Sequence, residues 1–314
     1  MNRMYKNIFL LISALLLLFI LSCRFLNTNE GSETTENSPL ETVRLLMEEN
    51  RQYENVQSRS TDAHAPEIKA ILDRGYIVFA MTASDVKPFF YKHEQTGEFI
   101  GLDVEIAYAI ANRLGVKAVF NRNPPTFDSV VTAVINKEAD VALSKLSLTI
   151  RRAELIRYTQ PYIVFRQALL INRLEYAKHG TEEQLPHFIR NFRGNIGVIV
   201  NSSYHNFAMI NFPNANIITF NNWNDTVDAL FNGELLAVYR DEGEVLIINN
   251  TRQDASILMK PVFIGDRRDQ IAMAVSSDAP LLQDWLNIFL DDYLMQNYKE
   301  LTPGRIIERH FGGF

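Results

Sequence analysis

The sequence predicts an α/β fold built from two lobes of similar size. Two observations support this prediction: short apolar segments alternate with helix-like segments, and the alternation occurs in two separate series along the chain. Alternating strands and helices are typical of a parallel sheet flanked by helices. The length of 314 residues is sufficient for two domains of this kind.

The first series begins near Glu67. Its predicted strands are three apolar segments, at residues 76–81, 116–120 and 140–143. Helices are predicted between these strands, over residues 102–114 and 127–136. We expect Gly115 to end the first helix, because glycine adopts the left-handed conformation of a helix C-cap without strain.

The second series begins at Asn195. Its predicted strands are residues 196–200, 216–220 and 235–239. Helices are predicted from Ser203 onward and over residues 224–232. This series therefore repeats the strand–helix alternation of the first and predicts a second α/β lobe.

The overall composition excludes some classes of function. The chain is 47% hydrophobic and 22% charged with a net charge of −6, so a nucleic-acid surface is not expected. The sequence contains no GxGxxG, P-loop, HExxH or GxSxG motif, and its six histidines are scattered. We therefore expect no cofactor, no metal site and no catalytic residues.

The first 22 residues have the pattern of a signal peptide. Arg3 and Lys6 precede an apolar run at residues 8–21, which is shorter than the roughly 20 apolar residues of a spanning helix. The single cysteine, Cys23, follows this run, and the segment ILSC at residues 20–23 resembles a bacterial lipobox. The resemblance implies cleavage before Cys23 and lipidation of its thiol. The alternatives are an uncleaved anchor or an ordinary signal peptide.

Residues 23–64 are predicted to form a lipid-anchored tether with one helix. Residues 24–38 are polar and almost free of large apolar groups, which is typical of a disordered segment. Ser38 and Glu41 then form a capping-box pattern, with proline at the first helical position, which predicts a helix to about Val56. Its single apolar stripe indicates a helix that packs on the domain surface rather than one that binds a partner.

A cluster of hydroxyl and guanidinium groups at residues 147–152 has the chemistry of a carboxylate site. Ser147, the backbone N–H groups near Thr149, and Arg152 lie within about one turn of an expected helix start. A carboxylate is best bound by a helix N-terminus, hydroxyl groups and a bidentate guanidinium. The alternative is that Arg151 and Arg152 are simply two exposed arginines on a helix.

Two segments resemble a known protein family. Residues 101–114, GLDVEIAYAIANRL, fit the signature of the family 3 extracellular solute-binding proteins, and residues 147–162, SLTIRRAELIRYTQPY, are similar to a second stretch of that family. The resemblance extends from about Glu67 to Gly313. It implies a two-lobed periplasmic-binding-protein-like fold of type II, with a ligand cleft between lobes joined by a two-strand hinge. On this basis lobe 1 comprises residues 65–165 and 270–314, and lobe 2 comprises residues 166–269.

The resemblance also assigns residues to the carboxylate of a ligand. Arg152 and Ser147 take the family's carboxylate positions, whereas Arg151 stands where the family usually has glutamate and is expected to face solvent. Phe127 takes the position of an aromatic residue that covers the ligand, the alternative being core packing.

Lobe 2 is expected to supply further binding residues. Ser202, Ser203 and Tyr204 stand at a family helix start, where Ser202 is a natural N-cap and the Ser203 N–H is an anion donor. Asp241 matches the acid that receives the ligand's α-ammonium, the alternative being a solvated aspartate at a strand end.

Two residues bear on selectivity. Asp85 lies in the loop that lines the side-chain end of the family's pocket. Lys145 either extends into solvent, the more common arrangement for a lysine, or points into the cleft. A lysine pointing inward would need a partner, either Asp85 or an acidic or amide ligand. In both cases strongly cationic amino acids are not expected to be the best ligands.

The function implied is that of a lipid-anchored extracytoplasmic protein that captures a polar amino acid or similar small carboxylate. We expect it to act as a monomer in the periplasm or at the cell surface, delivering the ligand to an ABC permease in the inner membrane. The alternatives are a ligand-sensing subunit of a signalling system and a dehydratase-like enzyme on the same fold.

Overall fold

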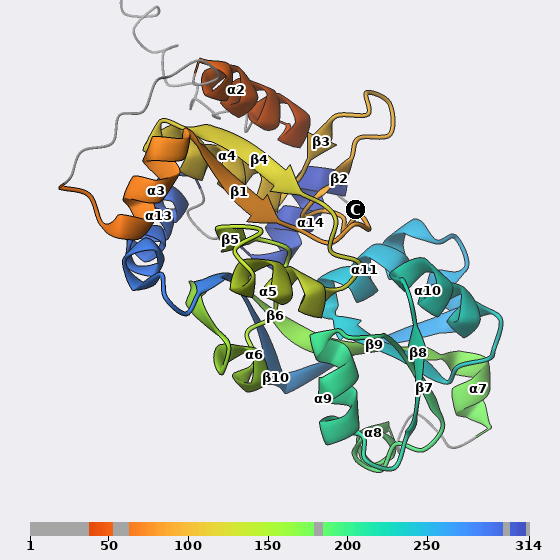
Figure 1. Cartoon of the computed structure of the whole chain (residues 1–314). Coiled ribbons are helices and arrows are strands. Elements are labelled where there is room, and N and C mark those ends of the chain that lie inside the picture. The colour runs from red at the N-terminus through yellow and green to blue at the C-terminus, as the bar shows by residue number, and fades with distance from the viewer. Residues whose placement is uncertain (1–37, 53–62, 179–184, 298–301, 312–314) are drawn as a thin grey trace, which may run out of the picture. The chain divides into compact units, whose positions relative to one another are not determined.

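The computed structural model describes residues 38–52, 63–178, 185–297 and 302–311 (Figure 1). The predicted signal peptide, the lipidation site Cys23, and residues 24–37 and 53–62 of the predicted tether lie outside the described residues.

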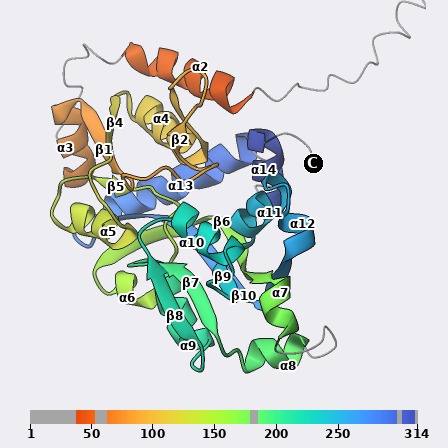
Figure 2. The same ribbon diagram turned by 90° about the vertical axis from the view of Figure 1, so that its right-hand side faces the viewer.

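Two long antiparallel strands connect the lobes. β6 (Ile156–Asn172) and β10 (Met259–Ser276) pair along almost their whole length, from Asn172 opposite Met259 to Ile156 opposite Ser276. They occupy the centre of an eight-stranded sheet with the order β4-β1-β5-β10-β6-β9-β7-β8 (Figures 1 and 2). The predicted two-strand connection between α/β lobes is thereby confirmed, and the predicted lobe boundaries fall inside these two strands.

Lobe 1 is built around a short parallel sheet. β1 pairs in parallel with both β4 and β5, and its helices pack around an apolar core that includes Phe79 and Leu286. The elements of this lobe are β1 (Tyr76–Ala80), β2 (Tyr91–Lys92), β3 (Phe99–Ile100), β4 (Lys117–Asn121), β5 (Val141–Ala142), α3 (Pro66–Arg74), α4 (Leu102–Leu114), α5 (Phe127–Ile135), α6 (Ile150–Ala153), α13 (Pro280–Asn297) and α14 (Pro303–Phe311).

Lobe 2 repeats the parallel arrangement. β7 pairs in parallel with β8 and β9, and β9 pairs antiparallel with β6. Its elements are β7 (Asn195–Ile199), β8 (Asn216–Phe220), β9 (Ala237–Asp241), α7 (Arg173–Ala177), α8 (Leu185–Arg190), α9 (Ser203–Asn211), α10 (Trp223–Phe231), α11 (Glu242–Thr251) and α12 (Ala255–Leu258). The predicted strands and helices of both series are present, and their bounds differ from the prediction by at most two residues.

The α4 helix ends as predicted from its sequence. Gly115 has φ of 70°, and its N–H donates to the carbonyls of Ala111 and Asn112. This left-handed C-cap turns the chain directly into β4.

The helix α2 (Pro39–Arg51) packs on lobe 1, as its apolar stripe predicts. Val43 belongs to the core of lobe 1, and α2 lies against α4. Asn50 is buried and donates to Asn112 Oδ1 and to the Val116 carbonyl, both at 2.8 Å, and accepts from the Ala118 N–H at 3.0 Å. The helix predicted within the tether is therefore fixed to lobe 1 by a buried polar contact.

Candidate functional site

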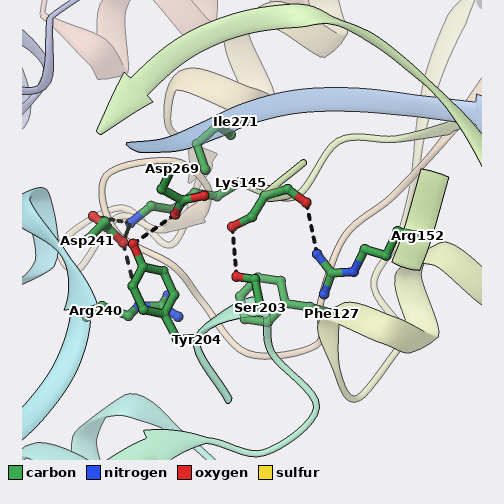
Figure 3. A pocket seen from close by; sticks show the side chains of 10 residues that line it. Phe127, Lys145, Arg152, Ser203, Tyr204, Arg240, Asp241, Asp269 and Ile271 are labelled. Carbon is green, nitrogen blue, oxygen red and sulfur yellow. Dashed lines mark hydrogen bonds and ion pairs between the residues drawn. The ribbon is translucent and has the colours of Figure 1, made fainter. Parts of the chain in front are cut away.

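A pocket lies where elements of both lobes meet (Figure 3). Lobe 1 contributes α5, the segment after β5, and α6, while lobe 2 contributes the start of α9 and the end of β9. The strand β10 closes one side. The lining residues are Phe127, Lys145, Ser147, Arg152, Ser203, Tyr204, Arg240, Asp241, Asp269 and Ile271.

Three helices begin at residues that line this pocket. Thr126, Ser202 and Asp241 cap α5, α9 and α11, and each side chain accepts a hydrogen bond from a backbone N–H three residues later. The positive ends of three helix dipoles therefore surround the pocket and favour a negatively charged group inside it.

The guanidinium of Arg152 is at the pocket wall. Its Nε and Nη2 donate to Asp128 Oδ1 at 3.0 and 2.9 Å, and its Nη1 donates to the Ser147 carbonyl at 3.1 Å. Arg152 is 5% exposed, whereas its neighbour Arg151 is exposed. The interpretation of both arginines as exposed is therefore wrong.

The helix that follows Ser147 is short. Thr149 caps α6 as predicted, but α6 has four residues, so its dipole is small. The positive charge on this side of the pocket therefore comes mainly from the Arg152 side chain. That guanidinium uses three of its five N–H groups on described protein atoms, which leaves two for a ligand.

A hydrogen bond between two serines joins the lobes inside the pocket. Ser203 Oγ of α9 donates to Ser147 Oγ at 2.8 Å, and both side chains are buried. Ser147 is held in place because residues 146–148 pair with β10, through the Leu148 N–H to the Gln270 carbonyl and a bridge between Ser147 and Ile271. Two predicted anion-binding residues from different lobes thus lie in direct contact.

Lys145 points into the cleft, so its predicted solvent-facing alternative is wrong. The residue is 5% exposed. Its Nζ donates to Asp241 Oδ1 at 3.1 Å and to Glu244 Oε1 at 2.8 Å. The ammonium also lies 4.8 Å from the ring centroid of Phe89 and 5.2 Å from that of Phe165, at cation–π distance.

The backbone of Lys145 explains why its side chain turns inward. The residue has φ of 47°, a left-handed backbone conformation that residues other than glycine rarely adopt. Its N–H donates to Asp103 Oδ2 at 2.7 Å, and Asp103 Oδ1 accepts from the Tyr162 hydroxyl at 2.8 Å. Burial raises the pKa of Asp103 to about 7, and the hydrogen bonds from Tyr162 and Lys145 oppose this rise. Asp103, from the signature segment of α4, thus positions a residue of the pocket.

Asp85 does not partner Lys145 and does not line this pocket. It accepts from Arg122 Nη2 at 2.9 Å and from the Lys92 N–H at 3.0 Å, and it is exposed. Of the two partners considered for an inward-pointing Lys145, Asp85 is therefore excluded, because Arg122 pairs with this acid.

Asp241 lies at the centre of the buried charges. It is 1% exposed and contacts the ammonium of Lys145 through both oxygens, at 3.0 and 3.1 Å, and Arg240 Nε at 3.7 Å. Burial alone would raise its pKa, but the charges of Lys145 and Arg240 hold the pKa below its ordinary value. The alternative of a solvated strand-end aspartate is therefore wrong.

Two of the other predicted residues have different local roles. Ser202 is buried as the N-cap of α9, with its Oγ donating to the Ile199 carbonyl, and it does not line the pocket. Tyr204 lines the pocket, and its hydroxyl donates to Asp269 Oδ2 at 2.9 Å.

Arg240 and Asp269 line the pocket and were not predicted from the sequence. The guanidinium of Arg240 lies 5.6–5.7 Å from the ring centroids of Phe127, Tyr204 and Trp223, and its Nε has no hydrogen-bond partner among the described residues. An arginine in an otherwise apolar strand, next to Asp241, is the sequence signal that could have indicated it.

Asp269 is a buried acid with one unused oxygen. Its Oδ1 has no hydrogen-bond partner in the described part of the chain. Burial, and then the charge of Asp241, raise the pKa of Asp269 to about 6. Its position at the predicted lobe boundary is the only sequence feature that pointed to it.

The described residues contain no group of three or more histidine, cysteine or acidic side chains arranged to hold a metal ion. None of the described helices has the length and apolar character required to traverse a membrane.

Two α/β lobes around a cleft of buried charged groups define a two-lobed solute-binding clamp. The chain belongs to the bacterial extracellular solute-binding proteins, family 3, whose family model matches residues 78–312.

Solved structures of similar fold include an ancestral amino-acid-binding protein, AncCDT-1, described as a precursor of cyclohexadienyl dehydratase. It has a TM-score of 0.63 and 23% identity, over 79% of this chain and all of that chain. A substrate-binding protein of an amino-acid ABC transporter from Streptococcus pneumoniae, bound to L-arginine, has a TM-score of 0.62 and 21% identity, over 75% and 95% of the two chains. These likenesses confirm the predicted type II fold.

Curated relatives match over a shorter segment. An arginine-binding periplasmic protein from Mannheimia haemolytica is 25% identical over 155 residues, which are 49% of this chain and 59% of that protein. A cyclohexadienyl dehydratase from Pseudomonas aeruginosa is 28% identical over 163 residues, which are 51% and 57% of the two chains. The match thus spans somewhat more than half the length of these relatives.

Proposed function

We propose that this protein is a lipid-anchored extracytoplasmic binding protein that captures a small carboxylate, such as a polar amino acid or a similar acid, for an ABC importer. The observation that supports this most directly is the meeting of Arg152, Ser147 and Ser203 at one point between the lobes. Together they provide a guanidinium with two N–H groups to spare and two hydroxyl groups, which can donate to one carboxylate once it replaces the Ser203–Ser147 hydrogen bond.

The position of these groups couples binding to lobe closure. Arg152 and Ser147 belong to lobe 1, whereas Ser203 belongs to lobe 2, so a carboxylate held by all three stabilises the conformation in which the lobes touch. A ligand shifts a conformational equilibrium by its difference in affinity for the two states. The closed form would then be the one that a permease binds. A ligand-sensing subunit would use the same closure to signal to a receptor.

Binding can be tested by thermal shift and calorimetry with a panel of small carboxylates. A ligand that binds the folded protein raises its melting temperature by mass action. Arg152→Ala should abolish the shift, and Arg151→Ala is the matched control because its side chain is exposed one position away. No response of the unaltered protein to any member of the panel would exclude a carboxylate clamp.

One observation favours a second candidate, a dehydratase-like enzyme. Asp269 lines the pocket with an unused oxygen and a pKa raised to about 6, which is suitable for a general acid. The similarity to a cyclohexadienyl dehydratase points the same way. Incubation with cyclohexadienyl carboxylates, followed by mass spectrometry, tests this candidate: loss of water that disappears in Asp269→Asn would establish it, and an unchanged substrate would exclude it.

A further inference from the structure

The ammonium of Lys145 is paired with Asp241, the acid that was expected to bind the α-ammonium of a ligand. Its Nζ is within 3.1 Å of both oxygens of Asp241 and 2.8 Å from Glu244 Oε1. All three side chains are less than one-tenth exposed. The contact is thus made inside the protein.

Asp241 has little capacity left for a second ammonium. Besides Lys145, its Oδ1 accepts from the Glu244 N–H at 3.2 Å, and Arg240 Nε lies 3.7 Å from its Oδ2. An α-ammonium placed there would lie beside two fixed cations in a site shielded from water. The repulsion between this ammonium and the cations of Lys145 and Arg240 would be strong, because solvent is excluded from the site.

Lys145 is also held in place. Its ammonium lies over the rings of Phe89 and Phe165, its N–H donates to Asp103, and its backbone is in the left-handed region. A left-handed conformation of a non-glycine residue costs on the order of 1 kcal/mol and persists only where the surroundings impose it. An incoming amino acid would therefore have to displace a lysine that several contacts hold.

We propose that Lys145 is a built-in ammonium that replaces the α-ammonium of a solute on Asp241, so that the cleft selects small carboxylates without one. This inference rests on the proposed carboxylate-binding function and specifies its ligand class: plain, 2-hydroxy or 2-oxo acids rather than amino acids. Arg152, Ser147 and Ser203 bind the carboxylate, and the Nε–H of Arg240, which makes no hydrogen bond among the described residues, is available to an oxygen elsewhere on the solute.

The test compares pairs of compounds that differ only in the amino group. Calorimetry on the unaltered protein would use glutarate and glutamate, glutaramate and glutamine, and pentanoate and norvaline. In the pair with the tightest binding, the compound without the amino group should bind at least about tenfold more tightly than the corresponding amino acid.

Variants at position 145 test the cause of this preference. Lys145→Met keeps the aliphatic stem but removes the ammonium. The affinity for each amino acid should therefore rise by about tenfold or more relative to the affinity for the matching compound without the amino group. Lys145→Arg keeps the positive charge and should keep the preference. Lys137→Met is the matched control, because Lys137 also has a left-handed backbone, with φ of 61°, but is exposed and pairs with Asp278. The unaltered protein alone decides the matter if Lys145→Met does not fold.

The outcomes separate this inference from the proposed function. If no compound of either kind binds, the carboxylate clamp itself is wrong. If amino acids bind the unaltered protein more tightly than their partners without the amino group, the clamp stands and the role of Lys145 is wrong, whatever Lys145→Met does. Tight amino-acid binding that is lost in Asp269→Asn would place the ammonium on Asp269 and would also overturn the inference.

Discussion

The buried carboxyl of Asp269 gives the sharpest prediction about stability. Burial and the neighbouring charge of Asp241 raise its pKa from 3.8 to about 6. A carboxyl with a raised pKa binds its proton more tightly in the folded state than in the unfolded chain. Its contribution to stability is therefore fully present below pH 3.8 and is lost as the pH rises through about 6.

The size of the effect follows from the same shift. Each pKa unit corresponds to about 1.4 kcal/mol, so a rise from 3.8 to about 6 amounts to up to about 3 kcal/mol. Asp269→Asn removes the titration while keeping the shape and an oxygen that accepts from Tyr204. Relative to the unaltered protein, the variant should gain up to about 3 kcal/mol of unfolding free energy between pH 3.5 and pH 7.5.

The measurement is urea unfolding at a series of pH values for both proteins. The chain has two tryptophans, Trp223 in α10 of lobe 2 and Trp285 in α13 of lobe 1, so fluorescence of single-tryptophan variants follows each lobe separately. The difference between variant and unaltered protein cancels the other titrating groups, including Asp103, whose pKa is raised in the same direction.

A difference that does not change between pH 3.5 and 7.5 would refute the reasoning. It would mean that Asp269 ionises as readily in the folded protein as in the unfolded chain, and hence that its carboxylate is solvated or paired. A change of the opposite sign would mean that the folded protein stabilises the charged form.

Three further predictions concern the anchor, the carboxylate site and α2. Cys23→Ser should release the protein from membranes without altering ligand binding, and unchanged detergent partitioning would contradict lipidation. Arg152→Ala should weaken binding of the best carboxylate about a hundredfold or more, whereas Arg151→Ala should cost under about 1 kcal/mol; calorimetry giving equal losses would reject these roles. Asn50→Ala should lower the free energy of unfolding by about 2–3 kcal/mol, because it leaves a buried carbonyl and a buried N–H without partners. A loss below about 0.5 kcal/mol in urea unfolding would show that α2 is not fixed to lobe 1 in this way.

The sequence predicts the fold well because the fold depends on local patterns. Apolar runs of strand length, Gly115 at a helix end, and serine or threonine at helix starts each define an element from a few neighbouring residues. The regular alternation of these elements then restricts the topology to parallel sheets with helices.

The charged partners in the cleft depend on long-range contacts and were predicted less well. Asp241 and Glu244 lie about 100 positions from Lys145 in the sequence, and the pairing exists only because β9 and the segment after β5 are brought together by β6 and β10. The family resemblance suggested Asp85 as one possible partner, because its loop lines the side-chain end of the family's pocket, but Arg122 already pairs with that acid.

The direction of the Lys145 side chain depends on a single backbone angle. Neighbouring serine and leucine residues give no indication that this lysine has a positive φ, which the hydrogen bond from its N–H to the buried Asp103 stabilises.

The buried charges in the cleft are better explained by recognition than by stability. Replacing a buried ion pair with apolar residues of similar size is often neutral or stabilising, because both charges lose their hydration on burial. Lys145, Asp241, Glu244 and Arg240 nevertheless form one buried cluster at the meeting point of the lobes. Such a cluster fixes the charges that a solute contacts when the lobes close. Because the Lys145 ammonium is paired with Asp241, the cations that remain for the solute are those of Arg152 and Arg240. The same geometry that makes the cluster costly for folding is the one that the proposed selectivity for carboxylates without an ammonium requires.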